Sequence, residues 1–103
     1  MQRKRLESAE TAGKVLASLS HPTRLLIVCL LLERERFVQE LLDELGSTKG
    51  NISQHLRILE RQGHVASRKD ANRVYYSVKD PKLARLLSVL QALYCPGLAL
   101  HEG

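Results

Sequence analysis

The run of eight apolar residues from Leu25 to Leu32 constrains the fold more than any other segment of this 103-residue chain. A helix with apolar side chains on every side has no face to turn toward water, so it has to lie inside the protein. Ser20 and Pro22 precede the run as a predicted N-cap and an early helical proline, and the helix is expected to cover residues 24–35. A chain of this length builds one modest core. We therefore expect a single domain, residues 1–103, packed around this central helix.

Two further helices are predicted after the central one, joined to each other by a tight turn. The first ends at Gly46, because glycine is favoured at helix C-termini. The second has Ser47 or Thr48 as its N-cap and ends at Gly63. Its buried face carries aliphatic residues at helical spacing, namely Ile52, Leu56 and Leu59. This arrangement is typical of a helix-turn-helix, here at residues 37–62.

A β-hairpin and two outer helices complete the predicted fold. Residues 64–78 contain two runs of β-forming residues joined by Asp-Ala-Asn, a pattern typical of a hairpin wing. Outer helices are expected over residues 6–19 and 81–95, the latter capped by Asp80 and ended by the pair Pro96–Gly97. The apolar stripe of the last helix consists of Leu83, Leu86, Leu87, Leu90 and Tyr94. Together these elements predict a mainly α protein with a small β-hairpin, a winged helix-turn-helix. Because so small a domain gains apolar burial by association, we expect a homodimer.

Composition restricts the classes of protein to which the chain can belong. A net charge of +5 and a pI near 9.6 favour a polyanionic partner. The longest apolar run is too short to span a bilayer, and the charged N-terminus does not form a secretory signal, so a cytoplasmic protein without a membrane partner is expected. Cytoplasmic thiols are kept reduced, so Cys29 and Cys95 are not expected to form a structural disulfide.

The second helix of the predicted pair presents a polar face away from its buried side chains. Gln54 suits the edge of an adenine, Gly50 allows the backbone to approach a duplex closely, and Lys49 lies at a helix N-terminus that attracts phosphate. On a lone helix these residues would form an ordinary solvated face, but the turn, the basic hairpin and the basic pI together favour double-stranded DNA. The predicted contacts are Thr48, Lys49, Gly50, Asn51, Ser53, Gln54 and Arg57 in the helix and Arg68, Lys69 and Arg73 in the hairpin.

Two rival classes make different demands on the sequence. A thiol oxidoreductase would use a C-x-x-C motif, and other enzymes a Gly-rich phosphate loop or a Ser/His/Asp constellation, none of which the chain contains. We therefore expect neither an enzyme nor a bound cofactor. A winged helix that binds only proteins is the other rival, and the outward-facing Gln54 and Arg57 argue against it.

Three stretches resemble the winged-helix repressors of the ArsR/SmtB family: LSHPTRLLIVCLL, STKGNISQHLRILERQGHV and RVYYSV. The resemblance covers nearly the whole chain. It implies a homodimer built on the helices at residues 6–19 and 81–95, with the helix after Thr48 in the major groove and the hairpin on the DNA backbone. It also implies an imperfect palindromic operator and repression that an inducer relieves.

Many members of this family sense metals, and their ligand positions can be compared with this chain. The C-V-C-D site of the family corresponds here to Phe37, Val38, Gln39 and Glu40, which lack both sulfur ligands. The site on the last helix needs histidine, and the segment 80–97 has none, while His101 lies beyond the helix. The other histidines, His21, His55 and His64, lack ligand spacing. A metal site is therefore not expected, and His55 is interpreted as a packed, hydrogen-bonded histidine.

The positions of the cysteines resemble the sulfide- and redox-responsive branch of the family, the BigR, SqrR and YgaV type. That resemblance implies that the reduced protein binds DNA and that a disulfide or polysulfide between Cys29 and Cys95 releases it. The inducer would be a reactive sulfur species or an oxidant. Burial of Cys29 and the helix C-terminus at Cys95 both disfavour the thiolate, which favours sulfane sulfur over peroxide. The alternative is a repressor of the same family with another inducer, a metal or none, and with inert cysteines, since free cysteine also packs as a small hydrophobe.

Overall fold

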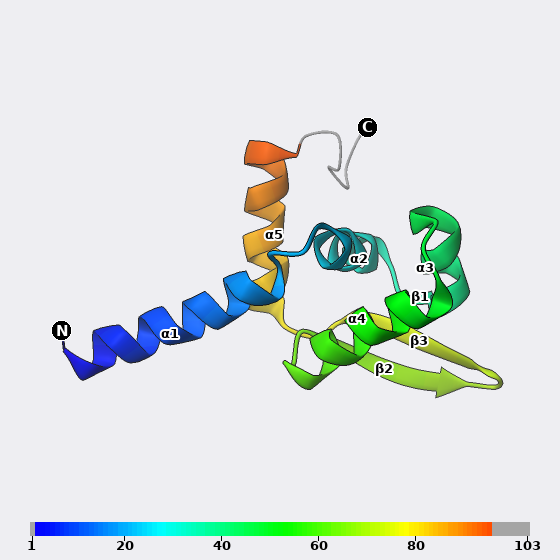
Figure 1. Ribbon diagram of the computed structural model, residues 1–103, viewed down its shortest axis with the longest axis horizontal. Helices are drawn as coiled ribbons and strands as arrows, with labels where there is room; N and C mark the ends of the chain where they lie inside the picture. Colours follow the sequence, from blue (N-terminus) through cyan, green and yellow to red (C-terminus); the bar gives the residue numbers. More distant parts are fainter. Residues whose placement is uncertain (1, 96–103) are drawn as a thin grey trace.

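The computed structural model describes residues 2–95, which form a helical body with a three-stranded antiparallel sheet at its base (Figure 1). In chain order the elements are α1 (Arg3–Ser18), α2 (Pro22–Glu33), β1 (Arg36–Phe37), α3 (Val38–Leu45), α4 (Lys49–Arg61), β2 (Val65–Asp70), β3 (Arg73–Val78) and α5 (Pro81–Tyr94). The β2–β3 hairpin projects to one side of the body, and α1 projects to the other. The predicted mainly α fold with a small hairpin is confirmed, whereas the predicted end of the last helix at Pro96–Gly97 lies outside the described residues.

Helix α2 is the centre of the protein, as the apolar run predicts. It contacts α3, α4 and β3. The apolar residues with at most 3% exposure in the described chain are Ile27, Val28, Leu31, Leu41, Ile52, Leu56, Leu59, Val65, Leu83 and Leu87. The predicted inner face of α4 is therefore confirmed, because its three aliphatic residues pack in the same core as α2.

The start of α2 differs from the prediction. His21, rather than Ser20, is the N-cap, and its Nδ1 accepts a hydrogen bond from the backbone N–H of Thr23 at 3.1 Å. The Ser20 hydroxyl instead donates to the carbonyl of Ala17 at 2.8 Å, so it satisfies the end of α1. The other predicted caps are present: Thr48 accepts from the N–H of Asn51, and Asp80 caps α5.

A short strand, β1, was not predicted from the sequence. Arg36 pairs with Tyr76 and Phe37 with Tyr75, which places β3 between β1 and β2. The central helix consequently ends at Glu33, two residues before the predicted limit. A two-residue segment is too short to show the alternating pattern of a strand in its sequence. It becomes a strand only by pairing with β3 of the hairpin.

Arg36 fastens this strand to the end of α2. The residue is 4% exposed, and its guanidinium donates to the carbonyl of Leu30 at 3.0 Å and pairs with Glu33. The carbonyl of Leu30 lies in the last turn of α2, where helical carbonyls lack partners within the helix. A buried charge is tolerated here because it is paired and hydrogen-bonded.

The hairpin turn is tighter than predicted. Asp70 pairs with Arg73, so Asp70 belongs to β2 and the connection consists of Ala71 and Asn72 alone. Ala71 adopts a left-handed backbone conformation with φ of 57°, which a two-residue hairpin turn requires and which alanine adopts at some cost.

The leucine stripe of α5 is divided between two faces of the helix. Leu83 and Leu87 are buried in the core of the single chain and so are not available to a partner, contrary to the predicted seam. Leu90 packs partly against the same core. The outer face instead exposes Leu86, Val89, Leu93 and Tyr94, with exposures of 40%, 58%, 69% and 77%. Helix α1 also exposes apolar residues, Leu6 and Leu16.

Within residues 2–95, no single helix is both long and apolar enough to cross a membrane. Helices α1 and α2 meet the length and composition criteria only when they are taken together as a pair bent by 91°.

Two histidines are buried in this fold. His55 is 8% exposed and lies against His21, with 4.7 Å between the ring centroids, while His64 is 5% exposed. The predicted packing of His55 is confirmed, but its Nδ1 has no hydrogen-bond partner within the described chain. Burial is the main cause that lowers the pKa of both rings; His21 and Arg24 lower the pKa of His55 further, whereas Asp80 raises that of His64.

Acid is expected to destabilise the protein through these two rings. The folded state keeps them neutral, whereas the unfolded chain binds protons below the ordinary pKa of 6.5. Their contribution is therefore complete above that pH and is lost as the pH falls through the lower folded-state pKa. Urea unfolding at about pH 7.5 and about pH 5.5 measures the difference. His55→Gln and His64→Gln should each lose less stability on acidification than the wild type, and equal losses in all three proteins would contradict this assignment.

Candidate DNA-binding surface and cysteine pair

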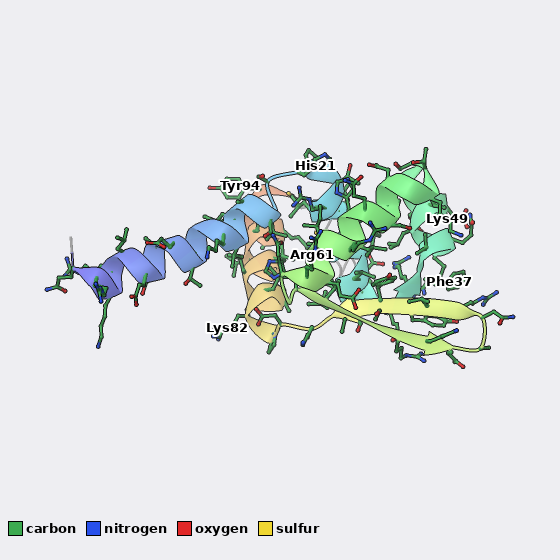
Figure 2. All side chains as sticks on the ribbon, turned by 60° about the horizontal axis from the view of Figure 1, so that its bottom comes forward. His21, Phe37, Lys49, Arg61, Lys82 and Tyr94 are labelled. Carbon is green, nitrogen blue, oxygen red and sulfur yellow. The ribbon has the colours of Figure 1, made fainter. Side chains whose placement is uncertain are left out.

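The outer face of α4 is polar and accessible. Gly50, Gln54 and Arg57 are exposed, and Ser53 is half-buried at the flank of the helix. A Cβ atom built on Gly50 would meet nothing within 4 Å, so the start of the helix is open to an approaching surface. Figure 2 shows Lys49 and Arg61 at opposite ends of this helix, above the hairpin. The face therefore extends along the whole helix.

Two of the predicted contact residues at the start of α4 already have partners in the free protein. Thr48 caps α4 through its hydrogen bond with the N–H of Asn51 at 3.1 Å, and the side-chain amide of Asn51 donates to the hydroxyl of Ser47 at 2.7 Å. Both therefore hold the turn between α3 and α4 in shape. Gln54, Lys49 and Arg57 form no ion pair or side-chain hydrogen bond within residues 2–95, so they are the groups that a ligand meets without first breaking a contact.

The wing carries its positive charge in a partly neutralised form. The guanidinium of Arg68 forms a two-pronged ion pair with Glu35, at 2.7 and 2.6 Å, and lies 4.8 Å from the centre of the Tyr75 ring. The hydrogen bonds from Arg68 lower the pKa of the Glu35 carboxyl. Arg73 lies over the ring of Phe37 at 4.4 Å. These contacts orient both arginines, and Lys69 alone of the three predicted wing cations has no such contact within the described part of the chain.

A cleft of about 260 Å³ separates the start of α4 from the tip of the wing. Lys49 of α4 and Arg73 of the wing both line it, together with Phe37 and Val74. The fold thus brings together the cations of the helix N-terminus and the wing, which lie far apart in the sequence. This face of the molecule therefore carries positive charge from two elements, α4 and the wing.

The contacts that orient the wing were not predicted. Glu35 lies 33 positions from Arg68, and Phe37 was interpreted as helical. No local pattern indicates either contact, because both depend on β1 pairing with β3.

The two cysteines lie on different helices: Cys29 is within α2, and Cys95 is the C-cap residue of α5. Cys29 is 4% exposed, Cys95 is half-buried and both are free thiols. Burial raises the pKa of Cys29, as predicted, and the nearby Cys95 raises it further, whereas the side-chain amide of Gln91 lowers it. The backbone N–H of Cys95 donates to the carbonyl of Gln91 at 2.9 Å. The two thiols are therefore near enough for a charge on Cys95 to act on Cys29, and Gln91 precedes Cys95 by one turn of α5.

The fold and this surface define a winged helix-turn-helix protein. Residues 21–67 match the family model described as "Bacterial regulatory protein, arsR family". The chain is 34% identical to the biofilm growth-associated repressor of Xylella fastidiosa over 84% of this chain and 76% of that protein. It is 37% identical to the HTH-type transcriptional regulator YgaV of Escherichia coli, over 86% and 91% respectively. The chain belongs to the arsR family of bacterial regulatory proteins, whose members are DNA-binding transcriptional regulators and not enzymes.

Solved structures share the whole fold. Reduced HlyU from Vibrio cholerae superposes with a TM-score of 0.86 at 32% identity, over 91% of this chain and 99% of that one. The homodimeric winged helix-turn-helix DNA-binding domain Mb0332 from Mycobacterium bovis, described as a possible ArsR-family regulator, superposes with a TM-score of 0.79 at 25% identity, over 100% and 95%.

Proposed function

We propose that the protein is a transcriptional repressor that binds a palindromic operator as a homodimer and is released when Cys29 and Cys95 become linked. The observation that carries this proposal is the position of the two free thiols, one inside the central helix and one at the end of α5. A link between them would join the body that holds α4 to the helix whose outer face is available to a partner. A cytoplasmic location fits both the DNA target and the reduced state of the thiols.

The DNA-binding part of the proposal rests on the accessible face of α4 and on the wing. In this proposal Gln54 reads a base edge in the major groove, and Lys49 and Arg73, which line the same cleft, contact phosphates. Gly50, Ser53 and Arg57 are proposed as further contacts. Thr48 and Asn51 act mainly by shaping the turn, and Arg68 reaches DNA only with its partner Glu35 beside it.

Base reading and phosphate binding are expected to separate in mutants. Gln54→Ala should cost about 1–3 kcal/mol on the preferred operator and relax the preference at one base pair. Lys69→Ala should weaken all sequences alike and reduce the slope of log K against log salt by about one. Fluorescence anisotropy with operator and random duplexes measures both. Gln2→Ala, at an exposed glutamine before α1 on the side of the molecule opposite the wing, is the matched control, and a Gln54 variant that lost equal affinity for both duplexes would contradict base reading.

The dimer is proposed to form through the outer face of α5 together with α1. Four large apolar side chains are exposed on α5 and two on α1, and soluble monomers rarely expose contiguous apolar patches of this kind. Two copies are also what a palindromic operator requires, because the symmetry of the site mirrors that of the protein. Val89 and Leu93 replace Leu83 and Leu87 as the central contacts of the proposed seam.

A charge on this face is expected to separate the subunits. Leu93→Glu should give monomers in analytical ultracentrifugation, because the carboxylate would be buried without a partner. Val74→Glu, which places the same charge on an exposed apolar position of the wing, should leave the association unchanged. A wild-type chain that sediments as a folded monomer at micromolar concentration would overturn the seam.

The proposed chemistry starts from a sulfane-sulfur donor R–S–SH. Its outer sulfur passes to one cysteine, which gives Cys–S–SH and R–SH. The second thiolate then attacks the inner sulfur, so the disulfide forms and HS⁻ leaves; the two thiols are oxidised by two electrons and the sulfane sulfur is reduced to sulfide. If both cysteines carry persulfides, the same attack gives a trisulfide and HS⁻, and the additional sulfur lengthens the link by about 2 Å.

Treatment of the reduced protein with a sulfane-sulfur donor tests this switch. The wild type should gain an intrachain link by intact-mass spectrometry and lose operator affinity, and a reductant should restore both. Cys29→Ser and Cys95→Ser should each stay bound under the same treatment. If either variant still releases DNA, or if the linked wild type binds as well as the reduced protein, the cysteines are core side chains and the inducer acts elsewhere.

A further inference from the structure

The segment between α2 and α3 joins the wing to the body of the protein. Arg36 fastens it to α2 through the carbonyl of Leu30, at 3.0 Å. On the other side the segment pairs with β3 through Arg36–Tyr76 and Phe37–Tyr75. The wing is a two-stranded hairpin that projects from the body (Figure 1), and a hairpin of two strands is only marginally stable without further contacts. Its orientation relative to α4 therefore depends on side-chain contacts as well as on this short ladder.

Side-chain contacts on both faces hold the middle of β2. The hydroxyl of Ser67 donates to the carboxylate of Glu60 in α4 at 2.7 Å. The next residue, Arg68, points to the opposite face of the strand and forms the two-pronged ion pair with Glu35, which lies 33 positions earlier in the chain. The first contact thus joins β2 to α4, and the second joins it to the segment that follows α2.

The guanidinium of Arg68 is engaged by three side chains. Its Nε and Nη2 donate to the two carboxylate oxygens of Glu35, its Nη1 lies 3.7 Å from Asp70, and its Cζ lies 4.8 Å from the centre of the Tyr75 ring. An isolated exposed ion pair contributes little, but a bidentate pair with further charges beside it is the exception. The arrangement therefore suits a group that fixes a position more than one that captures a phosphate.

We propose that Glu35 and Arg68 are positioning residues, whose ion pair holds the wing at the angle to α4 that operator binding requires. This proposal rests on the proposed DNA-binding function and is independent of the thiol switch. Arg68, which reaches DNA only with Glu35 beside it, acts through the orientation of the wing more than through its charge. Lys69, which has no such contact within the described residues, supplies charge instead.

A charge swap tests the proposal. Glu35→Gln and Arg68→Gln each break the pair, whereas Glu35→Arg combined with Arg68→Glu restores it with reversed polarity and leaves the net charge of the protein unchanged. The reduced full-length variants are compared by fluorescence anisotropy on a random duplex and on a duplex that the wild type has selected from a random library. Each single variant should lose about fivefold of its preference for the selected duplex, the upper range for one exposed ion pair, and the swapped double variant should regain it.

The two single variants also distinguish geometry from charge. A pure charge effect strengthens binding in Glu35→Gln and weakens it in Arg68→Gln, on both duplexes alike, because one variant removes a negative charge and the other a positive one. Loss of the wing's orientation lowers the preference for the selected duplex in both. These variants therefore decide the question even if the swapped variant does not fold.

Two further measurements complete the test. Glu10→Gln removes the same charge as Glu35→Gln from an exposed position of α1, away from the wing, and should leave the preference unchanged. In the absence of DNA, the amide hydrogens of the β1–β3 ladder should exchange faster in both single variants and return to the wild-type rate in the swapped variant. A folded swapped variant without the preference, or a Glu35→Gln variant that keeps it, refutes the positioning role.

The two proposals fail in different ways. If the wild type enriches no duplex from the library, operator binding is wrong and the positioning role falls with it. If the wild type selects a duplex and both single variants keep the same preference for it, operator binding stands and the role of the ion pair is wrong.

Discussion

Burial of α2 is the constraint on which the rest of the structure depends. Ile27 and Val28 have no exposed surface, and α3, α4 and β3 all contact this helix. Each such aliphatic side chain contributes about 1.5–3 kcal/mol when it is fully buried, and a domain of this size is stable by only about 5–15 kcal/mol in total. Each neighbouring element thus packs an apolar face against this helix. The polar faces of those neighbours are left on the outside, and the outer face of α4 is one of them.

The same packing also determines where the charged side chains of the outer surface lie. The end of α2 is held by Arg36, which places Glu35 and Phe37 beside the wing. Glu35 then pairs with Arg68, and Phe37 supports Arg73. A net charge of +5 describes the whole chain, but on the proposed DNA-binding surface the cations without an intramolecular partner within residues 2–95 are fewer and lie on α4 and at Lys69. Specific binding therefore depends more on the geometry of the helix and wing than on the total charge.

Helix α5 has two apolar faces, one in the core of the chain and one exposed at the surface. Its inner face completes the core with Leu83 and Leu87, and its outer face exposes Val89 and Leu93, where we propose that a second copy of the chain binds. Cys95 is the C-cap residue at the end of this helix. In the proposed switch, a covalent link at that point would act on the packing between the core and the proposed seam, and so on a DNA-binding surface elsewhere on the molecule.

The sequence by itself determined the elements whose signals are local: the central helix, the inner face of α4, the caps at Thr48 and Asp80, and the hairpin. These follow from periodicity and from hydrogen bonds between residues two to four positions apart. Only the tertiary structure decided the strand β1, the pairing of Glu35 with Arg68, the division of the leucine stripe of α5, and the burial of Gln91. The physical reason is that each of these depends on which element packs against which: a leucine at helical spacing is apolar on either face, and a buried glutamine is indistinguishable in sequence from a solvated one.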